Sequence, residues 1–412
     1  LFEQGDTMQS GTFLCLLALI ALPASIVALD NGLAPLPMMG WNTWCTDDYC
    51  GLFDYCYDKE IREMADAFVS EGLLEAGYNY IMLDDCWGGP RDANGELTAD
   101  PKRFPNGMQP VIDYVHSKGI NFGLYLCAGN LTCKYKRPGS WGYFDQDAST
   151  MAKWNVDFVK MDWCHHPSLS QKEVYGMFSE SLNKTGKAIY FNLCGWGEGN
   201  PWEWAMPIGN SWRVHTDHLP IWWTKSGTAD IIERMAGLSP YAAPGGWNDP
   251  DFLMTGLFPF THAESQTEFS LWSLWAAPLV VSTDVRGMSD WKKSVLLNKD
   301  IIAVNQDPLA IAGDRVFADS DGRQVWIKPL ADGDFAVVFY NSDNFLPRKV
   351  SASFDDIFNK QINPRQAAAN WPQGGAGRMK DLWEHKEIGV AASYETWLLP
   401  HHSVMLRVTP AF

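Results

Sequence analysis

Two short apolar segments of this chain each contain an aspartate near the end, and together they suggest carbohydrate chemistry. The first, VDFVKMDWC at 156–164, contains Asp162, and the second, SWRVHTD at 211–217, ends in Asp217. A barrel of parallel strands builds its active site from side chains at the C-terminal tips of those strands. Two carboxylates that face one pocket are the minimum equipment for hydrolysing a glycosidic bond. We therefore expect Asp162 and Asp217 to form a catalytic pair.

A basic residue precedes each aspartate. Lys160 lies two residues before Asp162, so strand alternation points both side chains to one face, where the lysine would keep the carboxylate ionised as a nucleophile requires. A buried ion pair without a catalytic role is the alternative. Arg213 lies four residues before Asp217, which as an acid/base should not be held in a tight bidentate pair. We expect Arg213 to contact sugar hydroxyls as well as to orient the pocket; the alternative for Asp217 is a solvated loop position.

Further carboxylates follow other predicted strands. Asp84 and Asp85 stand directly before a cysteine and a tryptophan, a set that suits bidentate hydrogen bonding to vicinal hydroxyls over an aromatic floor. Metal ligation is the rival interpretation, but two adjacent aspartates supply too few ligands and no histidine lies at a neighbouring strand end. Asp249 and Asp251, in GGWNDPD, add carboxylates at the expected mouth. We predict no metal site.

The elements that would position these residues are eight apolar, β-rich runs that alternate with helical patterns. Their hydrophobicity is continuous rather than alternating, which fits parallel strands covered on the outside by helices. Ser170 and Glu173 form a capping-box signature at the start of one such helix. We therefore predict a (β/α)8 TIM barrel over residues 29–306. The predicted strands are 36–41, 78–87, 121–129, 156–164, 188–196, 211–217, 241–250 and 277–285.

The pattern changes after residue 307, where strands follow one another without helices. Residues 331–333 (Ala-Asp-Gly) mark a hairpin turn, and a glycine-rich stretch at 372–377 is expected to be an exposed loop. We predict a separate C-terminal antiparallel β-sandwich domain over 307–412. The predicted strands are 325–330, 334–341, 349–354, 394–399 and 403–408.

The N-terminal segment and the cysteines point to the secretory pathway. Residues 13–22 are almost wholly apolar but too short to span a bilayer, and small residues follow up to Ala28. We expect a cleaved signal peptide within 1–28, with residues 1–7 upstream of the initiator Met8; a buried N-terminal strand is the alternative. Beyond it lie eight cysteines, an even number that suggests disulfides. Asn130 and Asn183 begin glycosylation sequons.

Composition limits the partners of this chain. The net charge of −17 argues against nucleic acid or an anionic membrane, and no apolar run is long enough for a membrane span. The expected partner is a small-molecule or glycan substrate, the expected location is extracellular, lysosomal or vacuolar, and a homodimer is compatible with the sequence.

Seven motifs in one order make the chain resemble glycoside hydrolase family 27, the α-galactosidases and α-N-acetylgalactosaminidases. The resemblance covers essentially the whole mature chain. It implies a (β/α)8 barrel with a C-terminal β-sandwich, hydrolysis with retention of configuration, and no cofactor. The motifs are MGWNTW (39–44), LDDCW (83–87), K-x-D-x-C (160–164), C-x-W-G (194–197), WRxxxD (212–217), GGWNDPD (245–251) and NQDP (305–308).

The resemblance also assigns roles to residues. It implies that Asp162 is the nucleophile and Asp217 the acid/base, and that Cys133 and Cys164 form a disulfide beside the active site. It further implies that Cys86 pairs with one of Cys45, Cys50 and Cys56, with the other two joined, whereas Cys127 and Cys194 have no assigned partner. The residues that it places at the substrate are Trp44, Asp84, Asp85, Tyr125, Cys133, Lys160, Cys164, Gly195, Trp196, Arg213 and Asp251.

One position departs from the family pattern. Many members carry Glu where this chain has Gly195, and that Glu contacts the 2-position of the sugar; α-N-acetylgalactosaminidases carry a small residue there. We expect galactose as the substrate sugar, with N-acetylgalactosamine as the alternative and Glu198 as a substitute that could reach the gap. A non-catalytic sugar-binding barrel is the remote alternative, disfavoured because both carboxylates and their basic partners are present. A metal-dependent hydrolase is a further rival that a chelator would test.

Overall fold

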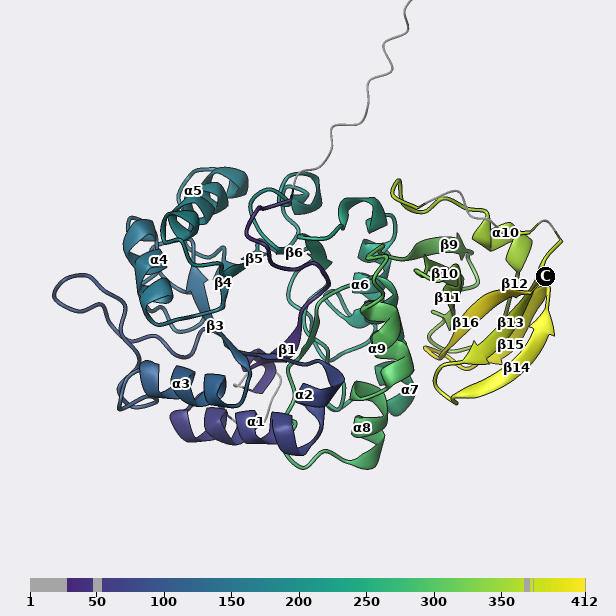
Figure 1. Ribbon diagram of the computed structural model, residues 1–412, viewed down its shortest axis with the longest axis horizontal. Coiled ribbons are helices and arrows are strands. Elements are labelled where there is room, and N and C mark those ends of the chain that lie inside the picture. Colours follow the sequence, from purple (N-terminus) through teal and green to yellow (C-terminus); the bar gives the residue numbers. More distant parts are fainter. Residues whose placement is uncertain (1–27, 47–53, 367–370, 373, 412) are drawn as a thin grey trace, which may run out of the picture.

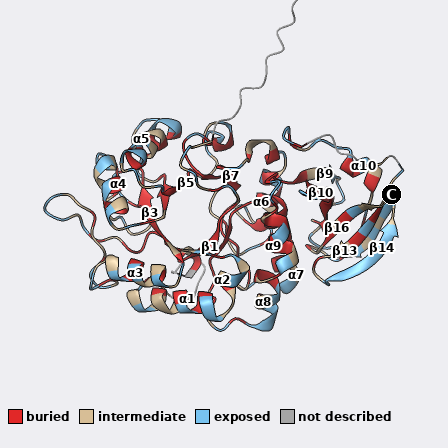
Figure 2. Ribbon diagram, viewed as in Figure 1, coloured by how far each residue is buried: buried red, intermediate tan, exposed pale blue. Residues whose placement is uncertain are grey.

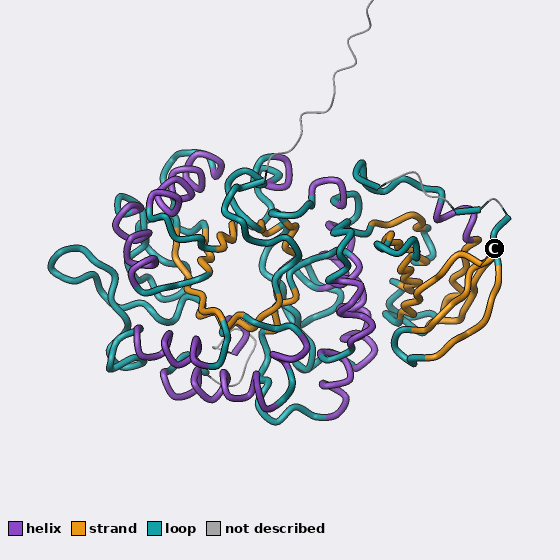
Figure 3. Tube along the Cα trace, in the orientation of Figure 1, coloured by secondary structure: helices purple, strands orange, loops and turns teal. Residues whose placement is uncertain are grey.

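The computed structural model describes residues 28–46, 54–366, 371–372 and 374–411. Its larger part is a sheet of eight parallel strands in the order β7-β6-β5-β4-β3-β2-β1-β8, surrounded by helices (Figures 1 and 3). All eight predicted strands are present, each shorter than predicted. They are β1 (Met39–Asn42), β2 (Tyr80–Leu83), β3 (Asn121–Cys127), β4 (Phe158–Asp162), β5 (Tyr190–Cys194), β6 (Ser211–Arg213), β7 (Trp247–Asp249) and β8 (Leu279–Val281).

The barrel closes between its last two strands through the segment that follows β7. Leu253 pairs in parallel with Val281 of β8, and its backbone N–H donates to the carbonyl of Val280 at 2.8 Å. The segment that contains Asp251 and Leu253 therefore pairs with β8 as a strand would and closes the barrel. The predicted TIM barrel is confirmed.

Helices cover the outside of the barrel, with buried faces toward the strands and exposed faces toward solvent (Figure 2). The capping box predicted at Ser170 is present, because its hydroxyl accepts from the Glu173 N–H and the Glu173 carboxylate accepts from the Ser170 N–H. The helices are α1 (Asp58–Ser70), α2 (Leu73–Ala76), α3 (Gln109–Ser117), α4 (Phe144–Lys153), α5 (Gln171–Lys184), α6 (Thr228–Met235), α7 (His262–Leu274), α8 (Asp290–Leu296) and α9 (Lys299–Asn305). Short 3₁₀ helices cover 44–46, 201–203 and 239–241.

The C-terminal part is antiparallel and packs a second core between two sheets. The larger sheet has the strand order β14-β13-β16-β11-β10-β9 and the smaller one pairs β12 with β15. Val337, Phe339 and Val350 lie in the apolar core between them. The elements are β9 (Asp314–Ala318), β10 (Arg323–Pro329), β11 (Phe335–Asn341), β12 (Arg348–Ser353), α10 (Phe354–Phe358), β13 (Ala376–Asp381), β14 (Lys386–Ala391), β15 (Ser393–Leu398) and β16 (Ser403–Ala411).

Two features of this domain differ from the sequence-based expectation. Strands β9, β13 and β14 were not predicted, and part of the expected exposed loop at 372–377 belongs to β13. Gly377 is buried there, and an added Cβ would lie 2.3 Å from the side chain of Val408. The glycine marks a close approach of β13 to β16 and not a loop.

Helix α7 joins the two domains. It is buried along almost its whole length and packs against α8 and α9 on the barrel side and against β10, β11 and β16 of the larger C-terminal sheet. The Thr267 hydroxyl, for example, donates to the carbonyl of His401 at 2.7 Å. In the described part of the chain, no helix has the length and apolarity needed to cross a membrane. The predicted signal segment falls, except for Ala28, outside the described residues.

Candidate active site

A pocket of about 240 Å³ opens at the C-terminal ends of the barrel strands. Side chains from the ends of β3 and β4 and from the segments that follow β1 to β6 converge on it, as expected for a barrel active site. Nine of the residues predicted at the substrate or for catalysis line it: Trp44, Asp84, Asp85, Tyr125, Cys133, Asp162, Cys164, Trp196 and Asp217. Thr43, Cys86 and Lys134 line it as well and were not predicted there.

Asp162 is the last residue of β4 and is buried at the base of this pocket. The Tyr125 hydroxyl donates to its Oδ2 at 3.1 Å, and the Trp163 N–H donates to its Oδ1 at 2.9 Å. Burial raises the pKa of Asp162 to about 7, and the charge of Lys160 acts in the opposite direction.

Lys160 lies beside Asp162 but forms its ion pair elsewhere. Its Nζ donates to Oδ2 of Asp84 at 2.7 Å, and both side chains are buried. The expectation that Lys160 simply holds Asp162 ionised needs correction, because burial has the larger effect on the pKa of Asp162. Lys160 forms an ion pair with Asp84 and acts on Asp162 only through its electric field.

Asp217 lies in the loop after β6, four residues beyond the last strand residue, Arg213. The prediction that β6 runs to Asp217 is wrong: after Val214 the chain turns, and the Thr216 hydroxyl bonds that of Ser226 at 2.7 Å. The Asp217 side chain is 45% exposed and lies 3.1 Å from Nη2 of Arg213 through one oxygen. The contact is single, not a bidentate clamp, as an acid/base residue requires.

Arg213 is buried and makes its shorter ion pair with Asp251, at 2.8 Å between Nη2 and Oδ2. Neither residue lines the main pocket; together with Lys160 they line a much smaller internal cavity behind it. These three residues were expected to contact the sugar directly, but their side chains do not form part of the wall of the main pocket. Their position is that of a charged layer beneath the residues that do face the pocket.

Asp85 is held by backbone donors. The N–H groups of Lys134 and Tyr135 donate to its Oδ2 at 2.7 and 3.2 Å. Burial raises the pKa of Asp85 to about 6, while these hydrogen bonds act in the opposite direction. With Asp84 beside it in the pocket wall, this carboxyl group is placed to accept hydrogen bonds from a polyhydroxylated ligand.

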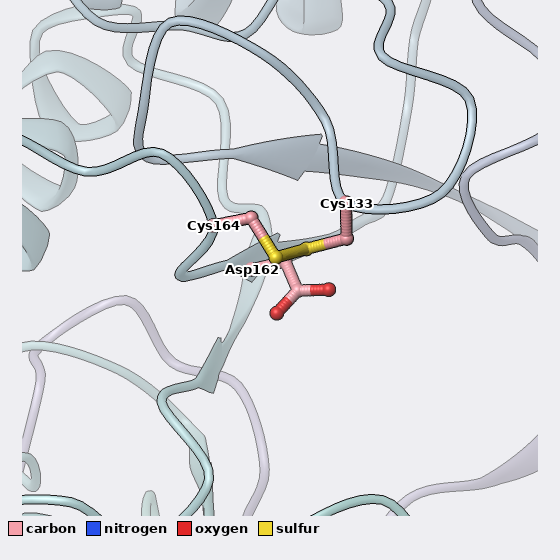
Figure 4. Close-up of side chains that lie close together, drawn as sticks. All are labelled: Cys133, Asp162 and Cys164. Carbon is pink, nitrogen blue, oxygen red and sulfur yellow. A yellow bond between two sulfur atoms is a disulfide. The ribbon is translucent and has the colours of Figure 1, made fainter.

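A disulfide joins Cys133 to Cys164 next to Asp162 (Figure 4). The three side chains have the spacing of a metal-binding group, but both sulfur atoms are committed to the disulfide and cannot supply thiolate ligands. The Cys133 N–H donates to the Tyr125 hydroxyl at 3.3 Å, and that hydroxyl donates to Asp162. The disulfide loop thus orients the partner of the carboxyl group.

The structure shows which cysteine pairs with Cys86, a choice that the sequence left open. Cys86 is joined to Cys56, Cys45 is also disulfide-bonded, and Cys50 lies outside the described residues. Cys127 and Cys194 are free and buried. The sequon residues Asn130 and Asn183 are both exposed, so glycosylation there remains a prediction that the structure allows.

Gly195 does not leave an open gap. A Cβ at this position would lie 2.3 Å from Oε1 of Gln171, the first residue of α5, whose Nε2 donates to the Gly195 carbonyl at 3.1 Å. Gly195 and Gln171 are both absent from the pocket lining, whereas Trp196 belongs to it. Glu198, the proposed substitute, is exposed. The side chain of Gln171 fills the space that sequence analysis left empty.

Two carboxyl groups, one at the end of β4 and one in the loop after β6, share one pocket of a parallel barrel and define the site of a glycoside hydrolase. The family model described as "Alpha galactosidase A" matches residues 36–307, and the model "Alpha galactosidase C-terminal beta sandwich domain" matches residues 320–408. The chain therefore belongs to the α-galactosidase family, glycoside hydrolase family 27.

Individual relatives extend over nearly the whole chain. "Alpha-galactosidase A" of Cellvibrio japonicus is 39% identical over 406 residues, which are 95% of this chain and 96% of that protein. "Alpha-galactosidase A" of Homo sapiens is 40% identical over 336 residues, 76% of each chain. Among solved structures, α-galactosidase I from Mortierella vinacea superposes with a TM-score of 0.83 at 32% identity and covers 92% of this chain and 98% of its own.

Proposed function

We propose that the protein is a retaining exo-α-galactosidase that removes terminal α-D-galactosyl residues from oligosaccharides, glycolipids or glycoproteins. The observation that carries this proposal is the shared pocket of Asp162 and Asp217, one buried and one half-exposed. The α-galactosidase relatives at about 39% identity support the choice of sugar.

The proposed reaction has two displacements. In the first, a carboxylate oxygen of Asp162 attacks the anomeric carbon, the bond from that carbon to the leaving oxygen breaks, and Asp217 donates its proton to that oxygen. In the second, Asp217 takes a proton from water, whose oxygen attacks the same carbon and releases Asp162. The hydroxyl of Tyr125 stabilises the carboxylate form of Asp162 in the free enzyme. No step needs a cofactor.

The catalytic assignment is tested by two variants and a control. Asp162→Asn should abolish hydrolysis of an aryl α-galactoside, and Asp217→Asn should lower it by about 10²–10⁴-fold, the usual range for a lost general acid. Asp145→Asn, on the exposed face of α4, is the matched control and should retain full activity. An NMR time course should show the α-anomer released first. Release of the β-anomer, or an unchanged rate in either variant, would refute the assignment.

Galactose is favoured over N-acetylgalactosamine by the position of Gln171. A small residue at 195 would favour an acetamido group if it enlarged the pocket, but here the side chain of Gln171 takes the space beside Gly195. We therefore expect higher kcat/KM with aryl α-galactosides than with aryl α-N-acetylgalactosaminides. Equal or reversed rates would instead support the N-acetylgalactosaminidase alternative.

The cellular setting is part of the proposal. Disulfides persist in oxidising compartments, and the exposed Asn130 and Asn183 are accessible to glycosylation. We therefore propose that the protein enters the secretory pathway and that a signal peptide starting at Met8 is cleaved near Ala28. We propose 29–306 as the catalytic domain and 307–412 as the β-sandwich domain, with a homodimer as the assembly. Peptide mapping of the mature protein and light scattering test these points.

A further inference from the structure

The residue that follows Asp217 is a fully buried histidine, His218. Its Nδ1 lies 2.8 Å from the carbonyl oxygen of Phe252, and its Nε2 lies 2.8 Å from the hydroxyl of Thr228. The ring also stacks on Trp272 of α7, with 5.6 Å between centroids. These three contacts restrict the His218 ring to a single orientation.

The two hydrogen bonds determine the protonation of the ring. A carbonyl oxygen accepts and never donates, so Nδ1 carries the proton and donates it to Phe252. Nε2 then accepts from the hydroxyl of Thr228. Burial lowers the pKa of His218 to about 3, so the ring stays neutral and cannot itself exchange protons with a substrate at working pH. Glu268, 3.8 Å from Nδ1, accepts instead from the N–H of Met254.

These contacts connect three pieces of the barrel mouth. His218 belongs to the loop after β6, Phe252 to the segment after β7, and Thr228 to the first turn of α6. The His218 N–H adds a fourth tie, because it donates to Oδ2 of Asp251 at 2.7 Å. The loop that carries Asp217 is thereby held at the residue next to it.

Asp217 itself is weakly held. Its side chain is 45% exposed, and the hydrogen bond that the structure gives it comes from Nη2 of Arg213 at 3.1 Å. Its position is therefore set mainly by its backbone, which His218 fixes. We propose that His218 is a positioning residue that holds the Asp217 carboxyl group at the distance from the leaving oxygen that proton transfer requires. This inference rests on the proposed role of Asp217 as acid/base.

Leaving-group dependence tests this role. The acid assists departure of a poor leaving group but is dispensable for an activated one such as 2,4-dinitrophenolate, and kcat/KM reports the steps up to that departure. His218→Leu removes both ring hydrogen bonds. It should lower kcat/KM for methyl or unsubstituted phenyl α-galactoside by about tenfold or more, since a 1 Å misplacement of a reacting group can cost ~10²-fold. For the dinitrophenyl galactoside, the loss in kcat/KM should stay below about threefold. The kcat with this substrate should be restored by azide, because azide replaces water in the second displacement and needs no general base.

Two gentler variants keep the test valid if His218→Leu folds poorly. Thr228→Val removes one hydroxyl and should give the same pattern at smaller size, whereas His218→Asn keeps a donor near the Nδ1 position and should recover much of the lost rate. Thr150→Val is the matched control, because this buried hydroxyl of α4 bonds only the Gln146 carbonyl in the described structure. It should leave the leaving-group dependence unchanged.

The outcomes separate this inference from the proposed function. If Asp217→Asn shows the leaving-group pattern but the His218 and Thr228 variants lose rate equally on all leaving groups, or not at all, the positioning role is refuted. If Asp217→Asn itself lacks the pattern, the acid/base assignment fails and the inference fails with it. The supporting result is a steep leaving-group dependence in Asp217→Asn and His218→Leu, a weaker one in Thr228→Val, and none in Thr150→Val.

Discussion

The sequence and the structure lead to opposite predictions for the activity of the variant Gly195→Glu. If the chain had lost a Glu that contacts the sugar and left a gap, restoring it should raise kcat/KM for α-galactosides by about tenfold or more, the value of one charge-assisted hydrogen bond. In the structure, the first atom of the new side chain would lie 2.3 Å from Oε1 of Gln171 and 2.7 Å from its Cδ. No real Cβ tolerates such distances, so Gln171 must move.

The size of the effect follows from what Gln171 would lose. Its hydrogen bond to the Gly195 carbonyl contributes about 0.5–1.5 kcal/mol, and overpacking a filled site typically costs about 1–3 kcal/mol. Together these give about 1.5–4.5 kcal/mol, and we expect the lower end of that range because the three nearest atoms all belong to the end of the flexible Gln171 side chain. We therefore expect Gly195→Glu to lower the Tm by several degrees and to lower, not raise, the rate with α-galactosides.

The assay is a thermal melt with parallel rate measurements on Gly195→Ala, Gly195→Glu and the double variant Gln171→Ala/Gly195→Glu. Gly195→Ala adds the same first atom and should show most of the loss in Tm. The double variant removes the obstruction and should recover stability, with a coupling of about 0.5–3 kcal/mol, as is usual for contacting residues. An unchanged Tm together with a tenfold faster galactosidase in Gly195→Glu would show that Gln171 does not occupy this space.

Two other changes have directions set by the structure. Lys160→Met removes a cation that lowers the pKa of Asp162. The pH below which kcat/KM falls, because the nucleophile becomes protonated and inactive, should therefore shift upward. An unchanged pH profile would contradict this effect of the lysine charge. The same variant leaves Asp84 buried without its partner, at a cost of about 3–5 kcal/mol that a melt would detect. Cys133→Ser/Cys164→Ser opens a loop with a sequence separation of 31 and should lower stability by about 3–4 kcal/mol. Because the Cys133 backbone also donates to Tyr125, galactosidase activity should fall too, and full activity in the folded double variant would argue against that brace.

The barrel was predictable because its signal is strong and repeated. Continuous apolar runs such as 188–196 belong to strands buried on both sides, and the residues of β5 are all buried. The ends of the strands were not predictable to the residue. Apolar character continues past the last ladder hydrogen bond, as after β6, where Val214 is still buried but the chain has begun to turn toward Asp217.

The C-terminal domain shows where the pattern fails. Strand β14 (KEIGVA) is exposed or half-exposed along its whole length, so its sequence carries little of the hydrophobicity that marks a buried strand. Strand β13 begins with Ala376 and Gly377, and glycine is usually a sign of a turn. Strand β13 is defined by its pairing with β16, and β14 by its pairing with β13; these are tertiary contacts that no local pattern reports.

In the site, the identities of the carboxylates were predictable but their partners were not. Spacing placed Lys160 and Asp162 on one face, and from spacing alone the lysine was assigned to the nearer aspartate. The partner in the folded protein, Asp84, is 76 residues away and arrives at the end of β2. Gln171 was missed for the same reason, because its link to Gly195 crosses from α5 to the end of β5.

The two buried ion pairs behind the pocket place positive charge near both reacting carboxyl groups without holding either of them tightly. Lys160 pairs with Asp84, and Arg213 makes its shorter contact, 2.8 Å, with Asp251, so each cation is held by a carboxylate that does no proposed chemistry. Asp162 therefore lies close to the positive charge of Lys160 without forming a salt bridge, and that charge opposes the rise in its pKa that burial causes. Asp217 receives only the longer, single contact of 3.1 Å and stays half-exposed to solvent. A group that must give a proton in one step and take one in the next needs that loose attachment, and its precise placement then has to come from the backbone beside it.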